Sequence, residues 1–157
     1  MADSYPAELI TGGRASDQNF PDDEKLYIRF DQMDGKKVAP DSLRCPNQSA
    51  NRSTLCSKPE WVLLSEPPEP PDKYKHWGYG YVTVGSIPTP LIPVGAKSTD
   101  FIPIHDPRPY NYSHTEIKAY RSGIEVRNLQ HNVRLLFKTK LAQKITPLKK
   151  PGLPVAP

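Results

Sequence analysis

The sequence contains little cysteine and no long hydrophobic run, and these two shortages narrow the class of protein first. Only two of the 157 residues are cysteines, Cys45 and Cys56, which excludes a small scaffold held together by many disulfides. No window of about 18 apolar residues occurs, which excludes a membrane-spanning helix. The first residues also lack the basic region and apolar run of a secretory signal peptide. We therefore expect a soluble cytoplasmic protein with no membrane partner, whose two cysteines are reduced thiols.

Apolar residues in general are scarce, whereas proline is abundant. Hydrophobic residues make up 36% of the chain, and 19 residues are prolines. Proline fixes its own φ, lacks an N–H donor and disfavours helix at the preceding residue, so long helices are not expected through most of the chain. A chain of this length suits one domain with one core. We predict a single domain over residues 26–146, after a loosely ordered lead-in (1–25) and before a proline-rich flexible tail (147–157).

Alternation of apolar and polar residues locates the predicted strands. It indicates short strands at 26–30 and 78–84. A further strand at 101–104 should lie at a sheet edge, because Pro103 cannot donate a hydrogen bond to a neighbouring strand. Residues 40–57 are rich in small polar side chains, and we predict that they are irregular.

Residues 114–127 have two interpretations. The first is a hairpin that turns at Ser122 and Gly123 and continues with apolar and polar residues in alternation. The second is a short helix that Ser113 and Glu116 cap as a capping box. The alternation after Gly123 favours the hairpin.

One strong helix is predicted near the end of the chain, over about 132–145, with Asn132 as its cap. Its apolar stripe has a helical period and consists of Val133, Leu136, Phe137, Leu141 and Ile145. A short helix at 61–64 should start from a capping box made by Ser57 and Glu60. Together these elements predict an α+β fold: a short-stranded, mostly antiparallel sheet, one main C-terminal helix and proline-rich irregular segments.

Two histidines, two acids, an arginine and two tyrosines crowd into the proline-stiffened loop at 101–117. If His105, Asp106, His114 and Glu116 converge there, a carboxylate could fix the tautomer of a histidine and raise its basicity. The candidate catalytic residues for hydrolysis or phosphoryl transfer are then His105, His114 and Glu116. The alternative is that Asp106 caps a turn and the histidines hydrogen-bond to nearby backbone.

Two cysteines and two histidines have the right chemistry for tetrahedral zinc: Cys45, Cys56, His105 and His114. Structural zinc sites usually take each ligand pair from positions about two to five residues apart. Here the pairs are separated by ten and eight intervening residues. We therefore predict no metal and no cofactor.

Arginines supply a candidate phosphate site. The order of Arg29, Arg44, Arg52, Ser53 and Glu60 resembles that of residues in ADP-ribosyl-transfer folds, in which the arginine holds a dinucleotide phosphate and the acid orients the ribose. Arginine can bind a phosphate through two parallel hydrogen bonds, which gives this set a chemical basis. The alternative is that these residues are solvated surface charge.

An aromatic cluster beside two lysines suggests a third kind of site, and it comprises Tyr74, His76, Trp77, Tyr79 and Tyr81. Such rings could stack on the bases of a single-stranded nucleic acid, or could form half of a small core. The net charge of +4 is too small to decide between them. The candidate binding residues are Arg29, Arg52, Tyr79, Tyr81 and Arg108.

Several short motifs resemble a pattern found in small uncharacterised bacterial proteins, some of them associated with conflict or defence genes. The motifs are Asn51-Arg-Ser53, Pro59-Glu60, Gly78-Tyr-Gly80 and the loop from His105 to Ile117. The similarity covers about half of the chain. It implies a bacterial cytosolic origin and a compact α+β domain, and it implies no particular chemistry.

Because no catalytic motif has convincing spacing, we expect a non-enzymatic accessory or interaction module of a bacterial assembly, in a defence or phage-related setting, with another protein as its partner. One alternative is a small effector enzyme, either nuclease-like or ADP-ribosyl-transfer-like. It would use the His105–Glu116 loop or the arginine set. A second alternative is a single-stranded nucleic-acid-binding protein, whose affinity would fall steeply with salt.

Overall fold

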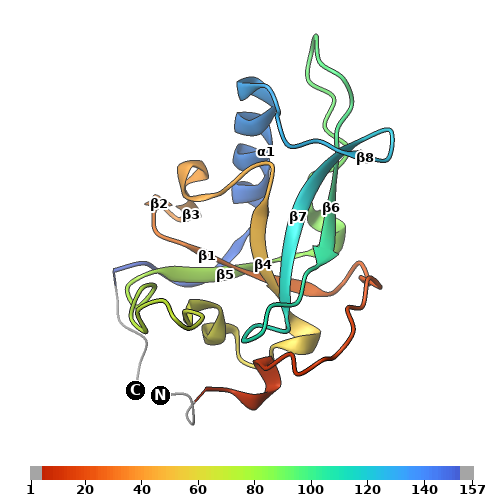
Figure 1. The fold of residues 1–157 in the computed structure, drawn as a ribbon. Coiled ribbons are helices and arrows are strands. Elements are labelled where there is room, and N and C mark those ends of the chain that lie inside the picture. Colours follow the sequence, from red (N-terminus) through yellow and green to blue (C-terminus); the bar gives the residue numbers. More distant parts are fainter. Residues whose placement is uncertain (1–4, 153–157) are drawn as a thin grey trace.

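The computed structural model describes residues 5–152 and has the predicted α+β architecture, with a mostly antiparallel sheet and one main helix (Figure 1). The main sheet has seven strands: β1 (Lys25–Phe30), β4 (Gln48–Arg52), β5 (Gly78–Thr83), β6 (Asp100–His105), β7 (His114–Arg121), β8 (Ile124–Glu125) and β9 (Thr146–Lys149). They pair antiparallel in the order β6-β7-β4-β1-β5-β9, and β8 pairs with the end of β7. A small separate ladder joins β2 (Met33–Asp34) to β3 (Lys37–Val38).

The only α-helix in the described part of the chain, α1 (His131–Lys144), packs on one face of the main sheet (Figure 1). The ring of Phe137 on this helix stacks on that of Phe101 on β6, with 4.0 Å between the ring centroids. Every second residue of β1 points to the same side, so Leu26, Ile28 and Phe30 are buried there. The core of the domain therefore lies between α1 and this face of the sheet.

Short 3-10 helices connect the strands: η2 (Ala7–Leu9), η3 (Pro40–Ser42), η4 (Ser53–Leu55), η5 (Pro59–Leu63) and η6 (Val84–Ser86). The short helix predicted at 61–64 is thus a 3-10 helix that starts at Pro59. The predicted capping box is wrong, because Lys58 precedes η5 and no side chain caps it. Asn132 is not a cap either, because α1 already begins at His131.

The prediction that residues 40–57 are irregular is wrong, because they contain β4 near the middle of the sheet. Ala50 is the only apolar residue of this strand, so no hydrophobic alternation marks it. The strand is stable because each buried polar side chain has a partner. The Asn51 side-chain oxygen accepts a hydrogen bond from Asn111, and Arg52 binds Glu24.

The two strand predictions that rested on proline and glycine are confirmed. β6, which contains Pro103, is one of the two edge strands in the order of the main sheet, and β9 is the other. The hairpin of β7 and β8 turns at Ser122 and Gly123, which have φ of 51° and 79°. Two consecutive residues with positive φ are typical of the tight hairpin turn that glycine favours.

The ends of the chain differ from the predicted lead-in and tail. Residues 5–24 run along the domain, where Leu9 is buried and the backbone of Asp17 hydrogen-bonds to His105. At the other end, 146–149 form β9, whereas 153–157 lie outside the described residues. Within residues 5–152, no helix has the length and apolar character needed to cross a membrane.

Candidate functional site

The sheet face opposite α1 carries polar side chains at its centre. In the β4–β7 register, Asn51 pairs with His114 and Ser49 pairs with Glu116. Directly paired residues of antiparallel strands point to the same face, and so do alternate residues of one strand. Ser49, His114 and Glu116 therefore share this face. Tyr27 on β1 pairs with Asn51, and Arg29, two residues further along the same strand, points to the same face.

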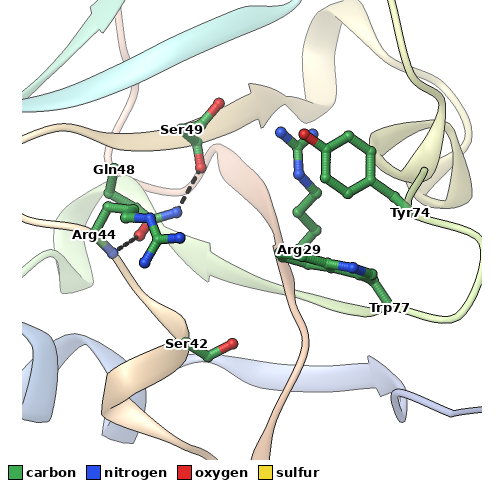
Figure 2. A pocket seen from close by; sticks show the side chains of 7 residues that line it. All are labelled: Arg29, Ser42, Arg44, Gln48, Ser49, Tyr74 and Trp77. Atoms are coloured by element: carbon green, nitrogen blue, oxygen red, sulfur yellow. Dashed lines mark hydrogen bonds between the residues drawn. The ribbon is translucent and has the colours of Figure 1, made fainter. Parts of the chain in front are cut away.

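A pocket of about 140 Å³ opens at this face beside β4 and β1 (Figure 2). We call it the Arg29 pocket, and it is lined by Arg29, Ser42, Arg44, Gln48, Ser49, Tyr74 and Trp77. These residues come from two central strands, from the segment before β4 and from the loop before β5. The pocket is thus lined by two strands and by the two loops next to them.

Arg29 is the central charge of the pocket. Its guanidinium lies 3.7 Å from the ring centroid of Tyr74, and one nitrogen donates a 3.2 Å hydrogen bond to the Val62 carbonyl oxygen. Burial lowers the pKa of Arg29 below its ordinary value, although arginine still carries its charge at neutral pH. Within residues 5–152 no carboxylate lies within ion-pair distance of it. The pocket therefore contains a half-buried cation without an acidic partner.

A second arginine, Arg44, enters the same pocket from the segment before β4. Its backbone N–H donates a 2.6 Å hydrogen bond to the Gln48 side chain, which fixes this segment against the strand. Gln48 in turn donates to the carbonyl oxygen of Ser49, as the dashed lines of Figure 2 show. Among the described residues, Arg44 forms no ion pair. Two unpaired guanidinium groups in one pocket favour an anionic ligand.

The Ser49 hydroxyl makes a hydrogen bond with His114, and the surroundings of the imidazole fix its direction. Nδ1 of His114 lies 2.9 Å from the carbonyl oxygen of Asp106, which can only accept, so Nδ1 carries the hydrogen. Nε2 is then unprotonated in the neutral ring and accepts from Ser49 Oγ at 2.9 Å. Burial, followed by the charge of Arg108, lowers the pKa of His114 from 6.5 to about 4, so the ring is neutral at pH 7.

Glu116 shares the face of His114 but binds cations. One of its carboxylate oxygens lies 3.5 Å from an Arg108 nitrogen, and the other lies 4.0 Å from the Lys118 ammonium. Arg108 also donates to Glu66 at 3.3 Å. These ion pairs make Arg108 and Glu116 a charged border next to His114.

His105 belongs to the other face of the sheet. It pairs directly with Thr115, the neighbour of His114, so the two histidines point in opposite directions from the sheet. Its Nδ1 accepts from the Asp17 N–H at 2.8 Å, and its Nε2 donates to the Tyr112 carbonyl oxygen at 2.6 Å. Both ring nitrogens thus hydrogen-bond to backbone, as the alternative interpretation of this loop describes. The structure does not bring His105, His114 and Glu116 together.

The other members of the predicted arginine set lie apart from the pocket. Arg52 forms a buried ion pair with Glu24, at 2.8 Å. The Ser53 hydroxyl accepts a hydrogen bond from the backbone N–H of Lys25, and Glu60 lies on η5. Only the first two arginines of the set, Arg29 and Arg44, line the pocket.

The aromatic cluster is divided between pocket and sheet. Tyr74 and Trp77 line the Arg29 pocket, and their rings pack edge to face with 5.1 Å between centroids. Tyr79 and Tyr81 lie on β5, half-buried, on the same face as Arg29. The Lys25 ammonium lies 4.5 Å from the centroid of the Tyr81 ring, so this tyrosine already has a cationic neighbour.

The four zinc-ligand types do not form a metal site in the part of the chain that the structure describes, where no group of three or more His, Cys, Asp or Glu side chains could hold an ion. Cys45 and Cys56 are both free thiols. Burial raises the pKa of Cys45 to about 11 and that of Cys56 to about 12, so both are protonated at neutral pH. Neither cysteine is therefore a thiolate nucleophile or ligand in this fold.

Sequence reasoning found Arg29, Arg44 and His114 as candidates but missed Ser49. Its strand carries no hydrophobic alternation, and its partner His114 is 65 residues away. The usable signal was that two separate candidate groups, the arginines and the histidines, each contribute one residue, Arg29 and His114, to the same face of the sheet. Comparisons with protein-family models, with curated proteins and with solved structures find no match to this chain. The resemblance to small bacterial proteins stays a prediction.

Proposed function

We propose that this protein binds a small phosphate-bearing ligand in the Arg29 pocket. The observation that carries the proposal is the half-buried Arg29 guanidinium, held against Tyr74 and the Val62 carbonyl with no carboxylate partner among residues 5–152. A charge that has lost part of its hydration gains most from an anion that restores its hydrogen bonds. The ligand would supply the counter-charge that the described chain does not.

Phosphate matches the donors of the pocket better than a carboxylate does. Two guanidinium groups, from Arg29 and Arg44, offer more N–H donors than the two oxygens of one carboxylate can use. A phosphate monoester has three terminal oxygens and carries up to two negative charges. Ser42 and Ser49 also line the pocket, but their hydroxyls donate to Asp31 and His114, so the guanidinium groups supply the donors to the phosphate.

The aromatic wall indicates the chemistry of the remainder of the ligand. Tyr74 has Arg29 on its ring face, whereas Trp77 lines the pocket with its indole (Figure 2). An indole gives apolar contact and a stacking surface to a flat group next to the phosphate. We therefore expect an aryl or nucleoside phosphate to bind more tightly than inorganic phosphate.

Trp77 also supplies the measurement. The chain has two tryptophans, so Trp61→Phe leaves Trp77 as the only indole, at the wall of the pocket. Phenyl phosphate is titrated into this variant, and the quenching of Trp77 fluorescence gives the affinity. Arg29→Gln should weaken binding about tenfold or more, because a charge-assisted hydrogen bond contributes about 1.5–3 kcal/mol. Arg127→Gln is the matched control, since the Arg127 side chain is 83% exposed and pairs with Glu125.

Three results would contradict the proposal: no saturable quenching with phenyl phosphate, equal affinity in Arg29→Gln, or tight binding of benzoate in place of phosphate. A single-stranded oligothymidylate is titrated in parallel. If only the oligonucleotide binds, and its affinity falls steeply with salt, the chain is a nucleic-acid-binding protein and the small-ligand proposal is lost.

The prediction of a protein-interaction module ranks below ligand binding. The proline-rich segment 66–71, whose composition would suit partner docking, folds back on its own chain, where the Ser65 hydroxyl donates to the Pro70 carbonyl oxygen and Glu66 pairs with Arg108. A docking strip of extended prolines would instead keep its backbone carbonyls and flanking charges free for a partner.

A further inference from the structure

We infer that the Arg29 pocket is a catalytic site, in which Ser49 attacks the phosphorus of a bound phosphate monoester and His114 acts as its general base. This inference rests on the proposed function, because the pocket must first hold the phosphate. It goes further by naming the reaction, which is transfer of the phosphoryl group to Ser49 and then to water.

The first argument is the orientation of the serine–histidine pair. Oγ of Ser49 lies 2.9 Å from Nε2 of His114, within the range of a nucleophile and its base. The carbonyl oxygen of Asp106 holds the hydrogen on Nδ1, so Nε2 presents its lone pair to the serine hydroxyl. Asp106 is thus a positioning residue. Its carboxylate, 3.7 Å from Nδ1, adds a charge that would stabilise an imidazolium.

The second argument is where the hydroxyl lies. Ser49 lines the Arg29 pocket from β4, with Arg29 and Arg44 on either side of it in the view of Figure 2. His114 is only 1% exposed, so it reaches the pocket through Ser49. A phosphate bound to the two guanidinium groups would place its phosphorus next to a hydroxyl that already has its base. The same guanidinium groups would stabilise the negative charge of the transition state.

The reaction balances with the substrate, water and these two side chains. In the first step Ser49 Oγ bonds to phosphorus, its proton moves to Nε2 of His114, and the bond from phosphorus to the ester oxygen breaks. The departing oxygen, which lies opposite Oγ in the in-line transition state, takes a proton from a water molecule and leaves as an alcohol, while the imidazolium keeps its proton and a hydroxide remains. The products of this step are a phosphoserine and the free alcohol.

Water completes the cycle. The hydroxide attacks the phosphorus of the phosphoserine from the side opposite Oγ, while the imidazolium of His114 still holds the proton on Nε2. The bond between Oγ and phosphorus breaks, and Oγ takes the proton back from Nε2. Inorganic phosphate leaves, and Ser49 and His114 return to their starting states.

The substrate itself would raise the basicity of His114. In the free protein, burial and then the positive charge of Arg108 lower its pKa to about 4, which makes a weak base. A phosphate dianion bound close to the ring would offset the positive charges of Arg108 and Arg29. The imidazole would thus become an effective base when a phosphate occupies the pocket.

The other acid–base groups of this region are already engaged. Both nitrogens of His105 bind backbone, on the opposite face of the sheet. Glu116 is paired with Arg108 and Lys118. Ser49 and His114 are therefore the pair through which a reaction in this pocket would run.

The test is hydrolysis of p-nitrophenyl phosphate by the full chain at pH 7.5, with acid quenching and mass spectrometry of the peptide that contains Ser49. We expect turnover and a phosphoserine at Ser49. Ser49→Ala and His114→Gln should each lower the rate at least about a hundredfold. Ser86→Ala is the control, because the Ser86 hydroxyl accepts a hydrogen bond from the Thr83 hydroxyl and Ser86 does not line the pocket.

A binding measurement separates loss of chemistry from loss of fold or ligand. Phenyl phosphate should still quench Trp77 in Ser49→Ala, with an affinity within about threefold of the parent. If the parent binds phenyl phosphate but neither hydrolyses p-nitrophenyl phosphate nor forms phosphoserine, this inference is overturned and the proposed function stands. If phenyl phosphate does not bind at all, the proposed function itself fails.

Two further results would also overturn the inference. One is hydrolysis that Ser49→Ala and Ser86→Ala leave equally unchanged, which would mean a contaminating phosphatase. The other is Ser49-dependent cleavage of p-nitrophenyl acetate without any cleavage of the phosphate ester, which would assign the pair to acyl transfer.

Discussion

Ser49 on β4 and His114 on β7 share a 2.9 Å hydrogen bond between Oγ and Nε2, although 65 residues separate them in the chain. The direct partner of His114 in the ladder is Asn51, so the bond runs diagonally across two neighbouring strands. It exists only because the register of these strands is correct, and it depends on a neutral imidazole. Folding and the protonation of His114 are therefore linked.

This linkage predicts how stability changes with pH. Burial, with a further contribution from Arg108 and against a smaller one from Asp106, lowers the pKa of His114 from 6.5 to about 4. Above pH 6.5 neither the folded nor the unfolded state holds this proton. As the pH falls towards 4, the unfolded chain binds a proton that the folded chain does not, so the free energy of unfolding decreases. The full effect is about 3 kcal/mol.

Urea denaturation between pH 7.5 and pH 4.5 measures this slope. His114→Gln should lose most of the decrease, because its side chain cannot take up the proton in either state. His76→Gln is the matched control, since His76 is exposed and should keep the wild-type slope. Equal slopes in His114→Gln and the wild type would show that this histidine does not carry the pH dependence.

A second prediction concerns the buried ion pair of Arg52 with Glu24. Both side chains are at most 3% exposed, and two hydrogen bonds of 2.9 and 2.8 Å join them. Although burial raises the pKa of Glu24, its hydrogen bonds from Arg52 and Thr54 outweigh that effect and lower it. Arg52→Met would leave the buried Glu24 carboxylate without its cationic partner. We therefore expect the free energy of unfolding to fall by about 3–5 kcal/mol at pH 7.

The loss should shrink at pH 4.5, where the isolated Glu24 of the variant is protonated at little cost. Arg127→Met removes a pair whose arginine side chain is 83% exposed, and should change stability by less than about 1 kcal/mol. Urea midpoints at both pH values give the comparison. A similar small effect for both variants would mean that the buried pair contributes no more than a surface pair.

Gly80 carries a third prediction, because β9 lies directly against it. A Cβ atom at this position would overlap the carbonyl oxygen of Thr146 and lie 3.0 Å from Cγ2 of Ile145. The clash involves backbone, which cannot move without breaking the β5–β9 ladder. Gly80→Ala should cost about 2 kcal/mol or more in urea denaturation.

Gly85→Ala is the matched control for this variant. Gly85 is exposed, and a Cβ there would approach Asp22 no closer than 3.2 Å. We expect a change of less than about 1 kcal/mol. If the two alanine variants lose equal stability, the close approach of β9 to Gly80 is not what requires glycine.

Short sequence patterns were enough to predict β1, β6 and the β7–β8 hairpin. The alternation of Leu26 and Ile28 with polar neighbours marks β1, and it works because one face of that strand meets the core. Pro103 predicted that β6 lies at an edge, because proline has no N–H to donate to a neighbouring strand. Gly123 predicted the hairpin turn, because glycine readily adopts a positive φ.

β4 and the site could not be predicted in this way. The buried side chain of Arg52 hydrogen-bonds to Glu24, which is 28 residues earlier in the chain. The buried side chain of Asn51 hydrogen-bonds to Asn111, which is 60 residues later. A polar strand with distant partners has no local signature. The same holds for the Arg29 pocket, where β4 brings a serine that no motif marks between an arginine of β1 and a histidine of β7.

His105 carries the last prediction, because it joins the N-terminal segment to the domain. Its ring accepts a hydrogen bond from the Asp17 N–H and donates one to the Tyr112 carbonyl oxygen. The Gln18 side-chain amide donates to the backbone carbonyl oxygen of His105 and accepts from its backbone N–H. His105→Ala would leave a donor and an acceptor without partners, at a cost of about 1–3 kcal/mol each when they stay buried. Opening of the segment would expose these groups to water and remove this cost. In His105→Ala, amide hydrogen exchange at residues 15–20 should therefore become faster than in the wild type, by more than any change in β1. His76→Ala, which removes an exposed ring, should leave exchange in both regions unchanged. Equal protection of residues 15–20 in His105→Ala and the wild type would show that other contacts hold the segment in place.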